Sequence, residues 1–517
     1  MVSTLLERVA ARGDDLAIAD EVGALTWREF NERENRLIAG MRGLGLAVGS
    51  TIALLGNNRR EWVEVLGAGG AIGAISVPVN WHFSVDEVAY ILENSGADAL
   101  VADAEFAEVA LAAAEQSGVG IRISYGGPID GFTDYDELLA SASPDEPAEE
   151  FAGATMFYTS GTTGRPKGVK SSLQAVGGDP KAAADQLGML MSLYGNPVDD
   201  NSVVLCNAPL YHAGPLAFCG VPFLLGAALI MRRKWDAAET LELIDRYKVT
   251  HYYAVPTFFT RMLKLPDDVK ADFSGDSLQF VMHTAAPCPP PVKQQMIEWW
   301  GPVINELYGA SEGAGTGAIV NSAEWLAKPG TVGKATAVTE IMIIDDDGER
   351  LPPGEIGQIY MKSLLGIDFE YLGDEEKTKK AHLEPSVFSF GDIGYLDDDG
   401  YLFISDRMIV MIFSGGVNIY PAEIEAVIIT HPDVADVGVF GIPNDDFGEE
   451  VKAAVQLIDG ADAERVEAEL KALCRDKLAG FKVPRSFDFI DLPRTATGKL
   501  PKRELRAKYW DDTGRTI

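Results

Sequence analysis

The sequence predicts an α/β protein with a large N-terminal domain, made of α/β subdomains and a small β-rich subdomain, and a smaller α+β C-terminal domain. Three observations support this class. Strand-like and helix-like segments alternate in the first part of the chain, which favours a mostly parallel sheet. After about residue 330, apolar strands flank acidic turns rich in Gly and Pro, which is typical of a β-rich unit. The length of 517 residues predicts two or more domains.

The alternation is clearest near the N-terminus. Thr26-x-x-Glu29 and Ser84-x-x-Glu87 have the pattern of capping boxes that start helices, and a further helix is expected around 61–74. Strands are expected at 51–56, 75–80 and 97–103, where apolar residues cluster. The parts before and after residue 175 form either one unit or two subdomains packed together, and the sequence leaves this open.

The last part of the chain predicts strands first and then a compact α+β unit. Two strands are expected within 339–362, and 394–407 predicts a hairpin with Asp399-Gly400 in its turn. From Pro421 onward the pattern is helix, strand, strand, helix, strand. This change of pattern places a boundary near Arg407, so we expect domains at 1–407 and 408–517.

Composition argues against several classes of partner. The formal net charge of −34 opposes sequence-independent binding to nucleic acid or to anionic lipid, because like charges repel. Four scattered cysteines predict neither a zinc site nor a disulfide framework and fit a reducing compartment, and the early charges do not resemble a signal peptide. We therefore expect a cytoplasmic protein with no nucleic-acid partner.

The segment 201–231 contains no Asp, Glu, Lys or Arg and imitates a membrane span. Its prolines, Asn207 and His212 interrupt the apolar run, whereas a spanning helix needs about 20 smoothly apolar residues. We expect a buried strand, a polar site loop and a core helix, with no integral membrane segment. Peripheral contact with a membrane is the alternative.

Residues 158–169 (YTSGTTGRPKGV) form the most informative stretch. Its three glycines free the backbone so that main-chain N–H groups can point toward one site, and its hydroxyls and Lys167 add donors and positive charge. This combination suits a polyphosphate. The glycine spacing differs from G-x-x-x-x-G-K-[ST], so the loop is not a Walker A motif. The alternative is an ordinary Gly/Thr-rich surface loop.

This loop resembles the signature loop of the adenylate-forming enzymes, the family of acyl-CoA ligases, luciferases and peptide-synthetase adenylation domains. Segments 209–215, 285–287, 308–312, 391–392, 414–425 and 493–499 resemble further motifs of that family, in the family's order. The resemblance implies ATP, or AMP as acyl-adenylate, together with Mg²⁺ and with CoA as co-substrate. The nucleotide-binding residues that it implies are Thr159, Ser160, Gly161, Thr162, Thr163, Gly164, Ala285, Ala286, Pro287, Tyr308, Gly309, Ala310, Ser311, Asp392 and Arg407.

The resemblance also implies individual roles. Lys499 corresponds to the lysine that bridges the acyl carboxylate and the α-phosphate, and Lys167 supplies positive charge at the phosphates. His212 stands between the acyl pocket and the thiol tunnel, and Glu312 holds Mg²⁺. The alternatives are a core histidine and a helix cap or surface acid. The C-terminal domain is expected to be mobile, with a CoA-binding loop at Ser414, Gly415 and Gly416.

The chain departs from the family where the hinge is expected. Six apolar residues, 408–413, follow Arg407, and the pivot position is the stiff, β-branched Ile409. Phe390 stands where threonine is common, and Ser386-Val387 replaces Gly-Trp. These changes either leave a repacked hinge with full activity or impair adenylation.

The sequence therefore predicts an AMP-forming acid–thiol ligase that converts a carboxylic acid to its CoA thioester through an acyl-adenylate, with bacterial fatty-acid and alicyclic-acid CoA ligases as its nearest types. One alternative is a thioesterification-dominant ligase that takes a preformed acyl-adenylate from a partner enzyme. Another is a non-catalytic acyl-adenylate-binding protein. Small residues after His212 and at Gly309-Ala310 favour a roomy pocket for a bulky acid, and a homodimer is left open.

Overall fold

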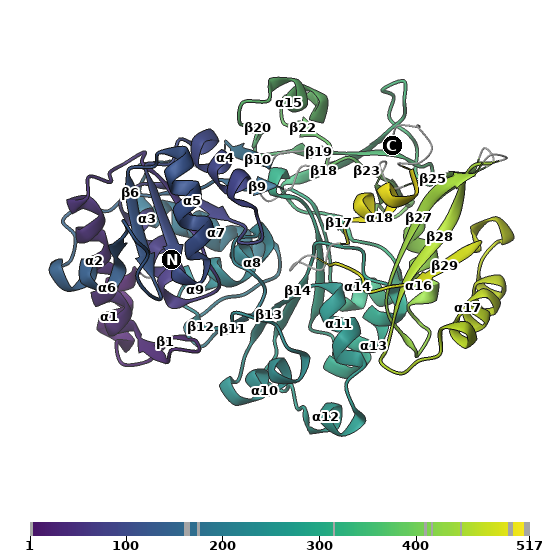
Figure 1. Cartoon of the computed structure of the whole chain (residues 1–517), viewed down its shortest axis with the longest axis horizontal. Coiled ribbons are helices and arrows are strands. Elements are labelled where there is room, and N and C mark those ends of the chain that lie inside the picture. The colour runs from purple at the N-terminus through teal and green to yellow at the C-terminus, as the bar shows by residue number, and fades with distance from the viewer. Residues whose placement is uncertain are drawn as a thin grey trace.

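The computed structural model describes residues 4–159, 166–172, 176–313, 316–407, 411–414, 417–444, 447–494 and 500–510. A large N-terminal part occupies the left and centre of Figure 1, and a smaller C-terminal part lies at the right. This arrangement of an α/β body and a smaller α+β unit confirms the predicted fold class.

A fully parallel six-stranded sheet is built from the early strands, in the order β7-β6-β5-β3-β4-β8. Its strands are β3 (Thr51–Leu55), β4 (Ile75–Val79), β5 (Ala99–Asp103), β6 (Ile121–Tyr125), β7 (Thr133–Asp134) and β8 (Ala154–Thr155). The helices of this part of the chain are α2 (Trp27–Gly43), which precedes β3, and α3 (Arg60–Ala71), α4 (Val85–Ser95), α5 (Ala107–Ser117) and α6 (Tyr135–Ser141), which lie between the strands in sequence. Thr26 and Ser84 cap α2 and α4 in complete capping boxes, as predicted.

A nine-stranded sheet forms the second layer, in the order β17-β16-β15-β14-β13-β11-β12-β1-β2. Its strands are β1 (Leu16–Ala19), β2 (Ala24–Thr26), β11 (Val203–Cys206), β12 (Ala228–Met231), β13 (His251–Ala254), β14 (Phe280–His283), β15 (Ile304–Tyr308), β16 (Ala318–Val320) and β17 (Lys334–Ala335). Because β1 pairs in parallel with β12, the N-terminal hairpin belongs to this later sheet. The chain therefore forms two sheets, but the division does not fall simply at residue 175.

The segment 201–231 contains two short α-helices that contribute to the site. It folds as β11, then α8 (Ala213–Pro215), a π-helical turn (Leu216–Gly220) and α9 (Val221–Leu224), which match the predicted strand and helix, and ends with β12, which was not predicted. The remaining helices are α1 (Leu5–Arg12), α7 (Pro180–Leu193), α10 (Ala237–Tyr247), α11 (Pro256–Leu263), α12 (Asp267–Asp272), α13 (Pro290–Trp300) and α14 (Ser322–Ala327).

Two smaller sheets complete the N-terminal part. The first joins β9 (Phe157–Thr159), β10 (Lys167–Ser171) and β20 (Phe369–Tyr371). The second contains β18 (Thr339–Ile344), β19 (Gly357–Ser363), β21 (His382–Glu384), β22 (Val387–Phe388), β23 (Asp392–Leu396) and β24 (Leu402–Arg407), with α15 (Glu375–Ala381) between β20 and β21. Strands β23 and β24 form the predicted antiparallel hairpin, and Gly400 in its turn has φ +80°.

The C-terminal part has its own sheet and its own buried core. Its elements are β25 (Ile412–Ser414), β26 (Val417–Ile419), α16 (Pro421–Ile428), β27 (Val434–Asn444), β28 (Gly448–Leu457), α17 (Ala463–Lys477), β29 (Ser486–Phe489) and α18 (Lys502–Trp510). From α16 to β29 the order matches the sequence prediction. Apolar side chains from these elements, such as Ile424, Val439 and Leu470, pack together in one cluster.

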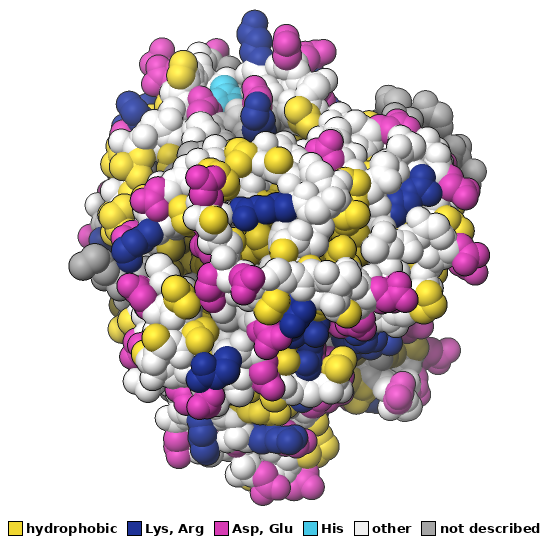
Figure 2. Space-filling model, turned by 90° about the vertical axis from the view of Figure 1, so that its left-hand side faces the viewer, with side chains coloured by type: hydrophobic (Ala, Val, Ile, Leu, Met, Phe, Trp, Pro, Cys, Tyr) yellow, Lys and Arg dark blue, Asp and Glu magenta, His cyan; other side chains and the backbone are white. Residues whose placement is uncertain are grey.

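Basic and acidic side chains are interspersed on the face shown in Figure 2, where neither sign forms a continuous field. Across the described ranges of the chain, no helix combines the length and the apolar character needed to cross a membrane.

Candidate active site

The structure brings residues from distant parts of the sequence to the wall of one cavity of about 2430 Å³. Elements from the first sheet, the second sheet and both small sheets contribute to it. The predicted site residues that line this cavity are Thr159, Lys167, His212, Ala285, Ala286, Pro287, Tyr308, Gly309, Ala310, Ser311, Glu312 and Asp392.

One side of the cavity is built around Lys167, the first residue of β10. Strand β10 runs antiparallel to β9, so Lys167 lies directly opposite Thr159. Ser160, Gly161, Thr162, Thr163 and Gly164, in the connection between these strands, lie outside the described residues. Burial, together with the nearby charge of Lys377, lowers the pKa of Lys167.

Sequence reasoning missed Tyr371, which connects two of the predicted residues. The Lys167 Nζ lies 5.1 Å from the centroid of the Tyr371 ring, within the range of a cation–π contact. The Tyr371 hydroxyl donates a hydrogen bond to Oε1 of Glu312 at 3.0 Å. Tyr371 is on β20, which pairs with β10, and no motif or spacing marks it in the sequence.

Glu312 has the chemistry that a magnesium site requires. It lies in a short 3₁₀ turn, Ser311–Gly313, at the cavity wall, and its side chain is only partly buried. Of its two carboxylate oxygens, Oε1 accepts from Tyr371, and Oε2 has no hydrogen-bond partner among the residues that the structure describes. A carboxylate oxygen of this kind suits Mg²⁺, which prefers oxygen ligands.

Another part of the cavity wall joins β15 to β23. The Tyr308 hydroxyl donates a hydrogen bond to Oδ2 of Asp392 at 2.7 Å, and Asp392 is only 6% exposed. Arg407 is the cross-strand neighbour of Asp392 in the β23–β24 register, and its side chain is outside the described part of the structure. Phe390 packs edge-on against Tyr308, with ring centroids 5.9 Å apart. The departure from threonine at this position therefore lies within the site.

Ala285, in the predicted adenine-binding segment after β14, has φ +78°. A residue with a Cβ rarely adopts this backbone conformation, and such outliers concentrate at functional sites. The preceding residue, Thr284, forms a 2.7 Å hydrogen bond between its hydroxyl and that of Tyr253.

A buried ion pair lies beside His283, two residues before Ala285. The Lys293 Nζ contacts Oε2 of Glu306 at 2.6 Å, and the Lys293 side chain is 0% exposed. His283 Nε2 lies 3.5 Å from the same oxygen, and burial lowers the pKa of His283 well below its usual range. Sequence analysis did not single out this cluster, because its three residues come from β14, α13 and β15.

His212 precedes α8, at the start of the π-helical region, and its ring packs against Tyr211 with centroids 4.2 Å apart. A π-helical turn often marks a functional site. The small residue Gly214 does not create the space that the sequence analysis expected, because a Cβ at this position would lie 2.5 Å from the Tyr253 hydroxyl. Its size permits the close approach of Tyr253. Other small residues of that prediction, Ala213, Ala217, Gly309 and Ala310, line the cavity.

The C-terminal residues are described only in part. Ser414 ends β25, is half-buried and does not line the cavity. Ile409, Gly415, Gly416 and Lys499 lie outside the described residues. Arg494 and Leu500 both line the cavity. Arg494 is held by two hydrogen bonds to the Asp436 carboxylate.

An α/β body whose cavity is lined by Lys167, the Glu312 carboxylate and the Tyr308–Asp392 pair fits an enzyme that binds a nucleotide. The AMP-binding enzyme profile matches residues 5–365, and the AMP-binding enzyme C-terminal domain profile matches residues 423–499. The chain therefore belongs to the AMP-binding enzyme family.

Individual relatives cover nearly the whole chain. A feruloyl-CoA synthase from Amycolatopsis sp. is 33% identical over 493 residues, covering 94% of each chain. A long-chain-fatty-acid–CoA ligase from Mycobacterium tuberculosis is 32% identical over 492 residues, covering 94% of this chain and 93% of the relative. The solved o-succinylbenzoate CoA synthetase from Bacillus subtilis, in complex with its acyl-adenylate intermediate, has a TM-score of 0.78 and 27% identity, with 98% of each chain covered. The same enzyme has also been solved with ATP and magnesium ion, at 28% identity, a TM-score of 0.78, and coverage of 97% of this chain and 98% of that chain.

Proposed function

We propose that this protein is an AMP-forming acyl-CoA ligase, which converts a carboxylic acid to its CoA thioester through an acyl-adenylate. The observation that carries this proposal is the convergence of Lys167, Glu312 and the Tyr308–Asp392 pair on the cavity that His212 also lines. The relatives support the same reaction, since they are named as a feruloyl-CoA synthase, a fatty-acid–CoA ligase and an o-succinylbenzoate CoA synthetase.

The chemistry explains why these groups are needed. A carboxylate is a poor electrophile, and its conversion to a mixed anhydride with AMP supplies a good leaving group for attack by the CoA thiol. Adenylation concentrates negative charge, so positive charge fixed in advance at Lys167 and Lys499 would stabilise the transition state. Mg²⁺, held by Glu312, would neutralise part of the phosphate charge.

The nucleotide would be positioned by three parts of the wall. Asp392, supported by Tyr308 and by Arg407 on the neighbouring strand, would accept hydrogen bonds from the ribose hydroxyls. The segments 285–287 and 308–311 would enclose the adenine, and Thr159 with the loop 160–164 would surround the phosphates. The left-handed φ of Ala285 and the buried Lys293–Glu306 ion pair nearby favour a segment held in one conformation.

The domain organisation that we propose is 1–407 for the nucleotide-binding domain and 408–517 for the mobile domain, with Ile409 as the hinge. Rotation of the small domain would bring Lys499 to the site for adenylation and the CoA-binding residues Ser414, Gly415 and Gly416 for thioester formation. The separate core of the C-terminal part supports this division.

The relatives do not favour the two alternatives of a thioesterification-dominant ligase and a non-catalytic binding protein. No supply of acyl-adenylate by a partner enzyme is needed for the complete reaction. We also propose a cytoplasmic location, from the charge and the four unpaired cysteines, and fatty or aromatic acids as the first substrates to test. Size-exclusion chromatography with light scattering tests for a homodimer.

The deciding experiment assays the two half-reactions separately. Purified protein is given a panel of fatty and aromatic acids with ATP, and pyrophosphate release is measured with and without CoA. Acyl-CoA formation from chemically prepared acyl-adenylate is measured in parallel. Robust pyrophosphate release followed by thioester formation is the expected result. Thioester formation from acyl-adenylate without pyrophosphate release from any acid would support the thioesterification-dominant alternative. Tight AMP binding without either half-reaction would support the binding protein.

A further inference from the structure

The cavity extends well beyond the residues that handle the nucleotide. Its far wall is formed by α1, α2, α3, α7 and α9, which lie at the left of Figure 1, whereas β14 and its neighbours lie near the centre. Most of this far wall is apolar, with contributions from Trp62, Leu66, Leu190 and Phe223. An acid whose carboxylate is at the reaction centre can therefore extend its apolar body toward α2.

One face of α2 makes the far end of the cavity polar. Trp27, Asn31, Glu34 and Asn35 all line the cavity, at helical spacings that place them on one side of the helix. All four are buried, although three carry polar side chains. Buried polar groups normally have hydrogen-bond partners, so each of these residues needs an explanation.

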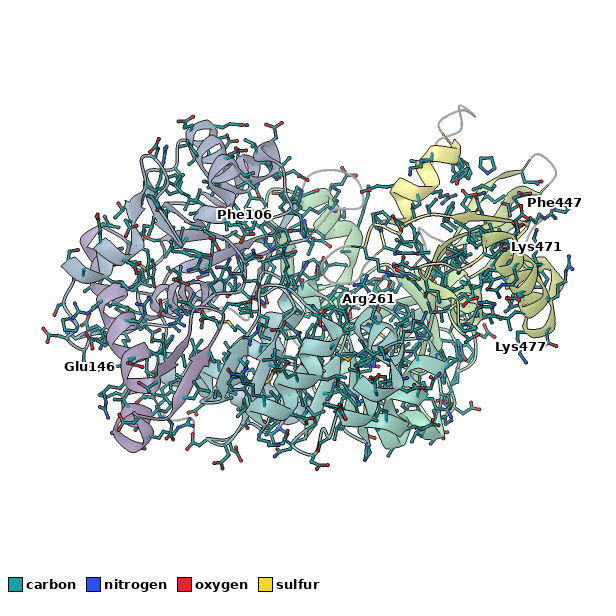
Figure 3. All side chains as sticks on the ribbon, turned by 60° about the horizontal axis from the view of Figure 1, so that its bottom comes forward. Phe106, Glu146, Arg261, Phe447, Lys471 and Lys477 are labelled. Carbon is teal, nitrogen blue, oxygen red and sulfur yellow. The ribbon has the colours of Figure 1, made fainter. Side chains whose placement is uncertain are left out.

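The two asparagines are explained by the fold. Asn31 donates a hydrogen bond to Glu146 at 2.7 Å, and Asn35 donates one to the carbonyl of Pro144 at 3.2 Å. Both bonds fix the segment that follows α6 against α2. Figure 3 shows Glu146 at the left-hand end of the molecule, opposite Phe447 and Lys471 in the C-terminal part.

Glu34 has no such explanation. It is 8% exposed, it lines the cavity, and it forms no hydrogen bond or ion pair with any residue in the described ranges. The neighbouring helix makes room for its carboxyl, because a Cβ at Gly67 of α3 would lie 2.1 Å from Glu34 Oε1. A second polar atom at this end, the indole N–H of Trp27, also has no acceptor among the described residues.

The charges around Glu34 indicate what kind of group it could accept. Burial, and then the negative charges of Glu150 and Glu64, raise the pKa of Glu34 to about 8 against the opposing positive charge of Arg8, so its carboxyl is mostly protonated near neutral pH and can donate a hydrogen bond. Charges of both signs lie at this end of the cavity: Glu150 opposes a carboxylate there, and Arg8 opposes an ammonium group. A neutral hydroxyl, which both donates and accepts, satisfies the site.

We propose that the far end of the cavity, at Glu34 on α2, binds a neutral hydroxyl group at the end of the acyl chain opposite the carboxylate. The preferred substrates are therefore long acids that carry a distal hydroxyl. This inference rests on the proposed ligase function, since it assigns the carboxylate to the centre formed by Lys167 and Glu312. Glu34 is a specificity-determining residue that acts far from the reacting atoms.

The test compares acids that differ only in the distal group. Straight-chain acids of about ten to about eighteen carbons are assayed with and without a terminal hydroxyl, and kcat/KM is measured for each pair. For the wild type we expect the hydroxylated acid to be favoured about tenfold at the length that reaches Glu34, which corresponds to one buried hydrogen bond. Glu34→Leu should bring this ratio close to one, and Glu34→Gln should retain part of it.

The matched control is Glu32→Leu, on the exposed side of the same helix, which should keep the wild-type ratio. A ratio near one at every chain length in the wild type, or an unchanged ratio in Glu34→Leu, would overturn the proposal. Isothermal titration calorimetry with the same acids separates this outcome from failure of the proposed function. If no acid is turned over, the ligase proposal fails. The hydroxyl site is then supported if hydroxylated acids bind more tightly to the wild type than to Glu34→Leu, and it is overturned if they bind equally.

Discussion

The hydroxyl of Tyr308 donates a hydrogen bond to Oδ2 of Asp392, with 2.7 Å between the two oxygens. This bond joins the end of β15 in the nine-stranded sheet to the start of β23 in the β-rich sheet. Asp392 is almost fully buried, so its carboxylate depends on fixed donors for its orientation. The position of the Asp392 carboxylate is therefore set by a contact between two sheets.

Removal of the Tyr308 hydroxyl tests this role. Tyr308→Phe keeps the ring against Phe390 but leaves Asp392 without this donor, so we expect the KM for ATP to rise about tenfold, as for loss of a hydrogen bond to a charged group. The measurement is pyrophosphate release against ATP concentration. Tyr395→Phe, on the same strand as Asp392 and stacked on Phe403, is the control and should leave this KM unchanged. If both variants had the same KM for ATP, the Tyr308–Asp392 hydrogen bond would not contribute to ATP binding.

Lys167 and Lys170 form a matched pair on β10. Lys167 lines the cavity beside Tyr371, whereas Lys170 points to solvent and pairs with Glu370. We expect Lys167→Met to lower kcat/KM for adenylation about a hundredfold, because a preorganised charge at the phosphates is lost. Lys170→Met should change it by less than about twofold, since exposed ion pairs contribute little. Thioester formation from prepared acyl-adenylate should be much less affected by Lys167→Met. Equal loss in the two half-reactions would argue against a role specific to the phosphates.

Local sequence signals predicted much of the fold. Capping boxes at Thr26 and Ser84, and the Asp399-Gly400 turn, depend on residues a few positions apart, and the structure contains all three. The pairing of β1 with β12 could not be predicted in this way, because parallel pairing between distant segments leaves no periodic signal. The position of the N-terminal hairpin therefore became clear only in three dimensions.

In the functional site, as in the fold, only residues with a local sequence signal were predicted. Motif residues such as Lys167, Glu312 and Asp392 were found because family motifs are local in sequence, and the structure places them on one cavity. Tyr371, Lys293 and Glu34 have no motif around them. Tyr371 acts through β-sheet pairing with β10, Lys293 through a buried contact with Glu306, and Glu34 through the face of an otherwise ordinary amphipathic helix.

The buried Lys293–Glu306 pair predicts an asymmetric response to mutation. Lys293→Met leaves the Glu306 carboxylate buried without its cation, so we expect a loss of about 3–5 kcal/mol in the free energy of unfolding. The double variant Lys293→Met/Glu306→Leu should recover most of this loss, because no unpaired charge remains. Urea denaturation measures both. Gln294→Met, exposed on the same helix, is the surface control. A double variant as unstable as the single one would mean that packing, rather than charge, dominates at this position.

Ser386 predicts a stabilising substitution. Its φ of +61° is a left-handed conformation that costs a non-glycine residue about 1 kcal/mol, and Ser386→Gly should return about that amount to the free energy of unfolding. The backbone hydrogen bond from its N–H to Asp368 does not require the side chain. The reverse change, Gly400→Ala at φ +80°, meets no atom within 4 Å of the new Cβ and should destabilise by a similar amount through backbone strain alone. Thermal denaturation would contradict this account if Ser386→Gly lowered the Tm.

Glu34 predicts a pH dependence of stability. Burial raises its pKa to about 8 from an ordinary 4.5, so between these values the folded protein holds a proton that the unfolded chain releases. This contribution to stability is complete below pH 4.5 and is lost as the pH rises toward 8, by up to about 1.4 kcal/mol per pH unit. Glu34→Leu lacks this loss, so its Tm relative to the wild type should increase steadily between about pH 5 and pH 8. Differential scanning fluorimetry across this range measures the difference, with Glu32→Leu as the control that should show a constant one. A constant difference for Glu34→Leu would mean that Glu34 titrates normally in the folded protein, as it would if water or a bound ion reached its carboxyl.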